Sequence, residues 1–362
     1  MSLTYRRQLL ALLGAGITVL AGCSGTDDSG GDNDDPLESN GADDTGEGGD
    51  ESGADEESLL EDGERPSYAS VLPSRDAYTS ESDETEYFFT AVDLETLLGT
   101  IDDDPGEGSV PDDPLLKNPI AAVSLGIYGL FSLGVSPVAQ VQAEAEGQAD
   151  DAALLYLDGT YVLYGAYDRE VARTGLEAEG YTLTADDDGD DDGYVVFTDD
   201  TSSEVVGVTD QAFVYTFGDE ERGLKVVSTI VETGVGDRPS AADEDDTFDT
   251  LLRANPDAGI TTCLYGDGEV LTDLEADQVD ADVEDVAFDF GAFEGSTGLN
   301  QRLTVDGGDS TVRAVVTYET ENAVEVDRLE SRLGGNASSV DVDVAGSVAV
   351  VTAEYTEDVI DE

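Results

Sequence analysis

The sequence predicts an α+β fold, a duplicated unit of antiparallel β-sheet with amphipathic helices packed on one face. Three observations predict it. Short runs of β-branched and aromatic residues alternate with segments of helical periodicity, several neighbouring runs are joined by residues that suit hairpin turns, and one strand-then-helix pattern occurs twice. The part of the chain that carries these signals has roughly 300 residues, enough for one large or two medium domains.

The predicted elements follow one another from residue 87 onward. Strands are expected where apolar β-formers cluster or alternate, and helices where apolar residues recur every three or four positions. Segment 303–312 is a hairpin signal, because Gly307 and Gly308 tolerate the positive φ of a tight turn. The expected strands are 87–93, 161–167, 194–198, 204–208, 212–217, 260–265 and 286–290, and the expected helices are 94–98, 169–179, 224–233 and 247–253.

An internal duplication is indicated by residues that match at one constant offset. In both halves a strand leads into an amphipathic helix, and the helix ends at a glycine, Gly180 in the first copy and Gly334 in the second. In the first of these helices Ala172 shares the expected apolar side with two of the matched residues. The matches are Val162, Val171 and Leu176 with Val315, Val324 and Leu329.

The hairpin after each helix is also repeated, with 209–215 corresponding to 344–350. The offset differs there, which places an insertion of about 18 residues in the first copy, around an Asp-rich tract. The predicted units are therefore an α+β repeat at 66–245 and a second at 246–362. Chance matching among Val-rich strands is the competing interpretation.

The segment from Gly234 to Ala258 contains a helix signal and then Ala-Asn-Pro-Asp-Ala ahead of a strand. This layout resembles secreted or lipid-anchored proteins that are classed only as a domain of unknown function. The resemblance supports the fold class and implies no chemistry.

Residues 1–22 are predicted to be an export signal peptide. An arginine pair precedes an uncharged apolar run at 9–20, which is too short to span a membrane. The pair resembles a twin-arginine signal, and the Leu-Ala-Gly-Cys tetrad resembles the lipobox of lipoproteins, whose cysteine is lipidated and becomes the first mature residue. An uncleaved anchor, with or without a Cys23–Cys263 disulfide, is the alternative. The signal residues are Arg6, Arg7, Leu20, Ala21 and Gly22, and the lipidated residue is Cys23.

Residues 23–65 are predicted to be a lipidated N-terminus and a disordered acidic linker. From residue 24 to 64 there are 17 acids and no basic residue, with many Gly and Ser. Such a segment buries too little apolar surface to offset the entropy lost on ordering. It would hold the folded part away from a membrane.

The charge balance indicates a habitat more than a function. The chain has 85 acidic and 15 basic residues, a formal net charge of −70. Self-repulsion of this size opposes folding at ordinary salt, and molar salt shortens the Debye length to about 3 Å. The composition resembles proteins of extremely halophilic archaea. Nucleic-acid mimicry or a basic partner is the alternative to a brine-adapted surface, and no basic patch supports nucleic-acid binding.

The Asp-rich tract fits a calcium-loop template, with acids at its first, third, fifth and twelfth positions and Gly193 at the sixth. The twelfth residue is Asp rather than the longer Glu, and a strand follows instead of a helix. We favour a solvated hairpin loop over an ion site. The candidate ligands are Asp188, Asp190, Asp192 and Asp199.

Two further segments have alternative interpretations. Segment 119–137 is uncharged and apolar, so it is either a core or interface helix, which we favour, or a membrane span. Asn336 begins the sequence Asn-Ala-Ser, which is either a glycosylation site or a plain turn.

The absence of histidine excludes Ser-His-Asp and Cys-His catalysis and histidine zinc sites. Paired carboxylates remain available, although none stands out among 85 acids. We expect no catalytic residues, no metal and no cofactor.

The resulting prediction is a lipid-anchored protein of an extreme halophile on the extracellular side of the cell membrane, with a non-catalytic binding or cell-surface role. Its expected partners are the membrane, through the lipid, and a protein or small molecule that the sequence does not identify. The alternatives are a solute-binding lipoprotein of a transporter and a carboxylate-dependent hydrolase.

Overall fold

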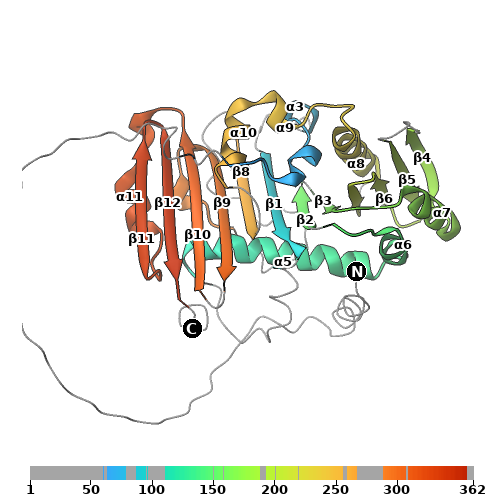
Figure 1. Cartoon of the computed structure of the whole chain (residues 1–362), viewed down its shortest axis with the longest axis horizontal. Helices are drawn as coiled ribbons and strands as arrows, with labels where there is room; N and C mark the ends of the chain where they lie inside the picture. The colour runs from blue at the N-terminus through green and yellow to red at the C-terminus, as the bar shows by residue number, and fades with distance from the viewer. Residues whose placement is uncertain are drawn as a thin grey trace, which may run out of the picture.

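One antiparallel sheet of 12 strands runs through the folded body (Figure 1). The computed structural model describes residues 60, 63–78, 87–94, 96, 111–149, 151–157, 159–187, 193–199, 201–218, 220–255, 259–266, 288–306 and 309–356. The strand order across the sheet is β11-β12-β10-β9-β8-β1-β2-β3-β7-β6-β5-β4. The predicted α+β class with an antiparallel sheet is confirmed.

The strands are β1 Tyr87–Asp93, β2 Ala153–Leu157, β3 Thr160–Tyr164, β4 Thr182–Asp187, β5 Tyr194–Asp199, β6 Glu204–Val208, β7 Ala212–Thr216, β8 Ile260–Tyr265, β9 Ser296–Asp306, β10 Asp309–Tyr318, β11 Ser339–Ala345 and β12 Val348–Tyr355. The helices are η1 Ser67–Val71, α3 Arg75–Tyr78, α5 Pro114–Gly134, α6 Val138–Ala145, α7 Arg169–Glu179, α8 Glu220–Gly234, α9 Ala241–Glu244, α10 Asp246–Arg253, η2 Gly291–Phe293, η3 Glu321–Ala323 and α11 Val326–Arg332.

Strand and helix positions agree closely with the sequence-based prediction. The bounds of α7, β6 and β8 are as expected, and β9 and β10 form the predicted hairpin. Helix α7 has the expected local signals, since the Asp168 side chain caps its first turn and Gly180 ends it with a φ of 95°. One residue on it was misplaced: Val171 is 39% exposed, whereas Ala172 and Leu176 are buried.

The predicted strand at 286–290 is wrong over its described part. Phe288 and Phe290 lie in an irregular segment that leads into η2. Their rings stack at 5.8 Å, and Phe88 of β1 meets Phe288 edge-on at 5.1 Å. The alternation of apolar residues in the sequence therefore reflects an aromatic cluster rather than strand pairing.

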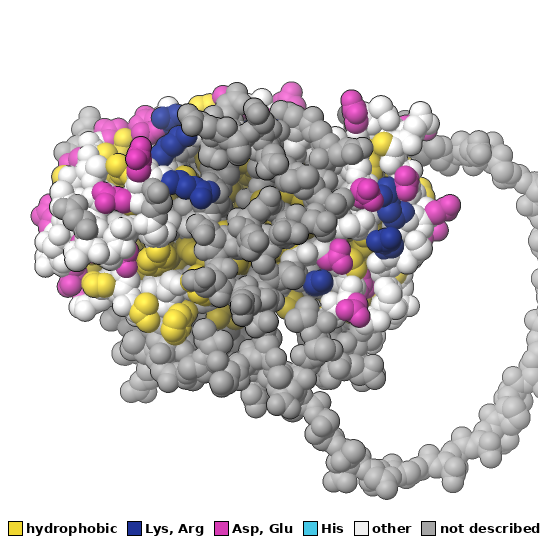
Figure 2. All heavy atoms as spheres, turned by 180° about the vertical axis from the view of Figure 1, so that it is seen from behind, with side chains coloured by type: hydrophobic (Ala, Val, Ile, Leu, Met, Phe, Trp, Pro, Cys, Tyr) yellow, Lys and Arg dark blue, Asp and Glu magenta, His cyan; other side chains and the backbone are white. Residues whose placement is uncertain are grey.

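The helices lie on both faces of the sheet, so the expectation that they share one face is wrong. Helices α5, α6, α7 and α11 pack in one core cluster, and we call this side the α5 face. Helices α8, α9 and α10 and the η1 turn pack in a second cluster on the α8 face. Strand residues alternate between the two: Leu154 and Tyr156 of β2 join the α5 face, and Leu155 joins the α8 face. In the view from behind, acidic side chains are scattered and hydrophobic ones gather in the lower part (Figure 2).

The two halves of the sheet have the same strand order. The run β1-β2-β3-β7-β6 in one half matches β8-β9-β10-β12-β11 in the other, with α7 and α11 at the same step of the chain. The first strands of the two runs, β1 and β8, pair with each other, and Thr90 lies opposite Thr262. The halves therefore share one continuous sheet. The unit boundary at 245/246 stays a prediction.

Strand pairing corrects the sequence match of the second hairpin by one residue. Val162 of β3 pairs with Val214, and its counterpart Val315 pairs with Val350. Val214 therefore corresponds to Val350, one position beyond the match read from the sequence. A one-residue slip moves every side chain to the other face of the sheet. With the corrected match, Val214 and Val350 both point to the α8 face. By the same pairing, Gly207 of β6 corresponds to Asp343 of β11.

Candidate functional site

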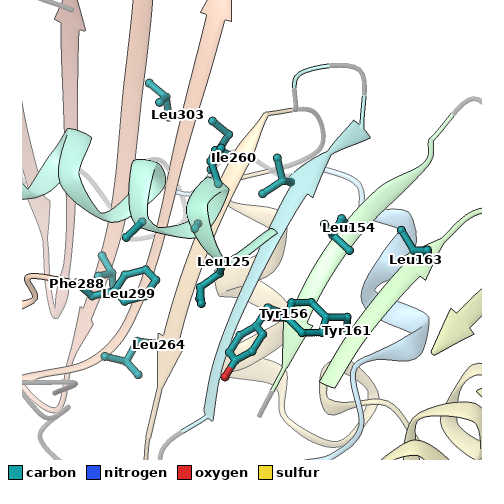
Figure 3. Packing of buried hydrophobic residues seen from close by; sticks show 14 of the residues in the cluster. Leu125, Leu154, Tyr156, Tyr161, Leu163, Ile260, Leu264, Phe288, Leu299 and Leu303 are labelled. Atoms are coloured by element: carbon teal, nitrogen blue, oxygen red, sulfur yellow. The ribbon is translucent and has the colours of Figure 1, made fainter. Parts of the chain in front are cut away.

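Helix α5 crosses the middle of the sheet and is held there at both ends by buried carboxyl groups. It contacts β10, β9, β8, β1 and β2, which are consecutive strands of the sheet (Figure 1). Its Leu125 side chain points into the core near Leu264 and Leu299 (Figure 3). Gly129 lets the helix approach closely, since a Cβ there would lie 2.3 Å from the Tyr161 ring. Segment 119–137, predicted as a core helix or a span, therefore forms most of α5.

The N-terminal end of α5 is fixed by Asp113. This residue is the helix N-cap, with Pro114 in the first turn, and its Oδ1 accepts hydrogen bonds from the backbone N–H groups of Leu115 and Gly334, both at 3.1 Å. Its Oδ2 accepts from the Tyr355 hydroxyl at 2.8 Å. Burial, together with the nearby carboxylate, raises the pKa of Tyr355 well above its ordinary value. Asp113 thus joins α5 to β12.

One turn after this N-cap, the Gln301 side chain replaces a helical hydrogen bond that Pro119 cannot make. Pro119 has no N–H, so the carbonyl of Leu115 four residues earlier lacks its helical partner. The Gln301 Nε2 donates to that carbonyl at 2.6 Å. Its Oε1 accepts from Nδ2 of Asn118, which is fully buried and also bonds the backbone of Asp289. A helix with an internal proline is stable here because the sheet replaces the lost bond.

The C-terminal end of α5 is fixed by Glu204. This carboxyl, at the start of β6, is buried and accepts hydrogen bonds from the Ser136 hydroxyl at 3.0 Å and from the Tyr181 hydroxyl. Burial, and then the bond to Glu204, raise the pKa of Tyr181 well above its ordinary value. Ser136 lies in the turn between α5 and α6. The depression beside Glu204, lined by Leu133 and Tyr215, has no room for a water molecule.

These two acids are too far apart to act together. Asp113 and Glu204 are the buried acids among the described residues. Seven strands lie between β12 and β6 in the sheet. Since α5 has 21 residues, its two ends are separated by roughly 30 Å, whereas paired-carboxylate hydrolysis needs about 5–10 Å. Each carboxyl instead accepts hydrogen bonds from groups close to its own end of α5, which is a structural role.

The predicted cation loop is only partly described. Asp188, Asp190 and Asp192 lie outside the described residues. Asp199 ends β5, where its carboxylate accepts from the side chains and backbone of Thr201 and Ser202. These bonds, the Ser202 hydroxyl first, lower the pKa of Asp199. Across the part of the chain that the structure describes, no group of three acids or cysteines could hold a metal ion.

The remaining candidates are placed as follows. Asn336 is exposed in the turn after α11. Cys263 is a free, fully buried thiol on β8, and burial raises its pKa. The signal and lipidation residues Arg6, Arg7, Leu20, Ala21, Gly22 and Cys23 lie outside the described residues. By length and composition α5 could cross a membrane, and 56% of its most apolar window is buried.

Sequence reasoning did not single out the acids that hold α5. One signal was present, since Asp113 followed by Pro114 is a helix start. Glu204 had none, because one acid among 85 looks like any other until the fold buries it.

No family model matches this chain, and no curated protein matches it. The solved structures that are similar include two crystal forms of TP0453. Crystal form III of TP0453 is 10% identical, covers 82% of this chain and 96% of its own, and has a TM-score of 0.37. Crystal form I of TP0453 is 12% identical, with coverage of 81% and 94% and a TM-score of 0.37. A TM-score of this size supports no conclusion about this chain.

Proposed function

We propose that this chain is a lipid-anchored extracytoplasmic protein of an extreme halophile with a non-catalytic binding or cell-surface role. The observation that carries the proposal is the Leu-Ala-Gly-Cys tetrad at residues 20–23, placed after an arginine pair and a short apolar run. Seventeen acids follow before residue 65, in a segment typical of a solvated linker.

The start of the folded body supports a tethered arrangement. Arg65, which follows the acidic run, forms ion pairs with Asp243 of α9 and with Asp249 of α10. The Arg65 hydrogen bond, supported by one from Ser240, lowers the pKa of Asp243. The linker therefore meets the body on the α8 face. A solvated linker of about forty residues, as proposed here, would span roughly 35 Å on average and at most roughly 130 Å, and would keep the body near the membrane.

The geometry favours binding over the two alternatives. A solute-binding lipoprotein of a transporter would place parallel strands in two lobes around a cleft, whereas the strands here form one antiparallel sheet. A carboxylate-dependent hydrolase would need paired buried acids, whereas Asp113 and Glu204 stand at opposite ends of α5.

Replacing the lipid attachment residue tests the anchor. Cys23→Ser should move the protein from the membrane fraction to the soluble fraction, because no thioether lipid can form. The matched control is Ser24→Ala, which leaves the tetrad intact and should keep the protein in the membrane fraction. Mass spectrometry of the native N-terminus should find a lipidated Cys23 as the first residue. An intact Met1 with an unmodified thiol would refute the anchor.

A further inference from the structure

The outer side of α5 carries an apolar stripe. Four apolar residues, Ile120, Ile127, Phe131 and Val135, lie along one line of the helix with Ser124, at three- and four-residue spacing. The Ser124 hydroxyl donates to the backbone carbonyl of Ile120 at 3.0 Å. All five are partly or fully exposed, and Val135 is 72% exposed. The opposite side of the helix is buried in the core of the α5 face.

Other helices of the body have charged outer sides. On α7, Glu177 and Glu179 are exposed, and on α8, Glu221 and Lys225 are exposed. In contrast, residues 118 to 143 contain no charged side chain, in a chain where acids outnumber bases by 85 to 15. A solvent-facing surface adapted to brine would carry acids here, as the other helices do. An exposed apolar stripe without them is typical of a surface that binds a partner or a membrane.

The size of the stripe favours a lipid surface over a second copy of the chain. Five side chains, most of them only partly exposed, offer on the order of 300 Å², below the roughly 800 Å² per partner of a stable protein interface. A membrane contact needs no partner surface of matching shape, so a narrow apolar stripe on one helix can bury its exposed side chains at the lipid boundary. Tyr128, next to the stripe and partly exposed, is a residue type typical of the membrane–water boundary.

We propose that the stripe on α5 lies against the membrane surface, with its apolar side chains at the boundary between lipid head groups and hydrocarbon. This inference rests on the proposed lipid anchor. The buried carboxyl groups at both ends of α5 would hold the helix flat across the sheet, so it would contact the bilayer along its length without crossing it.

The test uses residues 23–362 with Cys23→Ser, so that no lipid contributes, and phosphatidylcholine vesicles in molar salt. The protein should float with the vesicles. Val135→Glu should weaken this binding about tenfold, since a carboxylate at the boundary must be desolvated. The matched control is Val305→Glu on β9, where the valine is 52% exposed outside the stripe, and its binding should equal that of the parent. Circular dichroism should show all three folded.

Three results would overturn the proposal. These are no flotation of the parent, equal weakening by both glutamate variants, and a Val135→Glu effect on the sedimentation of a dimer rather than on vesicles. The last would show that a second copy occupies the stripe. Because the assay omits the lipid, its failure is separate from that of the anchor, which the Cys23→Ser fractionation decides.

Discussion

The α8 face has opposite characters in the two matching halves of the sheet. In β6, Val205 and Gly207 are buried beneath α8. In β11, their counterparts Asp341 and Asp343 are exposed. The strand order is the same in both halves. The shared topology therefore does not decide whether this face is buried. The residues that point to the α8 face decide it: Val205 and Gly207 in β6, and Asp341 and Asp343 in β11.

Close packing explains the difference. A Cβ on Gly207 would lie 2.6 Å from a methyl of Val227 and 2.7 Å from one of Val231, so α8 rests directly on the β6 backbone. Gly223 of α8 makes a similar approach to Thr216. A carboxylate at position 207 would have neither space nor water, whereas at position 343 it has both.

Alkaline pH should produce the largest loss of stability, and it should destabilise the first half of the sheet more than the second. Burial raises the pKa of nine tyrosines, with Tyr318 reaching about 12, above the unfolded value of about 10. Their stabilisation is complete below pH 10 and falls above it, by about 1.4 kcal/mol per pH unit for each tyrosine ionised only in the unfolded chain. Six lie in the first half (Tyr87, Tyr161, Tyr167, Tyr181, Tyr194 and Tyr215) and three in the second (Tyr265, Tyr318 and Tyr355).

Hydrogen exchange in molar salt between pH 9 and 11 measures this. After correction for the intrinsic exchange rate, β3 and β7 should lose protection before β10 and β12. Loss of protection in β10 and β12 first would show that buried tyrosines do not control alkaline opening.

A reciprocal exchange between the halves tests the face assignment. Gly207→Asp should lower the free energy of unfolding by about 4 kcal/mol, because it buries a charge against Val227 and Val231. Asp343→Gly, its counterpart, should lower it by less than about 1 kcal/mol, the usual cost of glycine in a strand. Denaturant unfolding in molar salt compares the two. Similar losses would mean that the α8 face is equally packed in both halves.

A matched pair of core truncations tests whether the halves are equivalent on the α5 face. Leu176 of α7 and Leu329 of α11 correspond by offset, and both are fully buried. Leu176→Ala and Leu329→Ala should each lower the free energy of unfolding by about 3 kcal/mol through lost burial and a residual cavity. The same unfolding experiment measures both. A difference above about 2 kcal/mol would contradict the equivalence of the two helices.

Local signals predicted most of the strands and helices. Helix α7 was placed correctly because its cap, apolar periodicity and terminal glycine are all near one another in the chain. Segment 286–290 was predicted as a strand because its apolar residues alternate in the sequence. In the structure, Phe288 and Phe290 stack on each other and Phe288 packs against Phe88, without strand pairing. The acids that hold α5 were not predicted, because Glu204 meets Ser136 and Tyr181 only in the folded chain.

The sequence by itself determined the order of strands and helices, the hairpins and the strand-then-helix repeat, because these depend on neighbours a few residues away. The tertiary structure decided that β1 and β8 join the two halves, that helices cover both faces, and that α5 lies across the sheet between Asp113 and Glu204. Those features depend on which distant residues share a face, and a one-residue change of register reverses that choice without altering any local pattern.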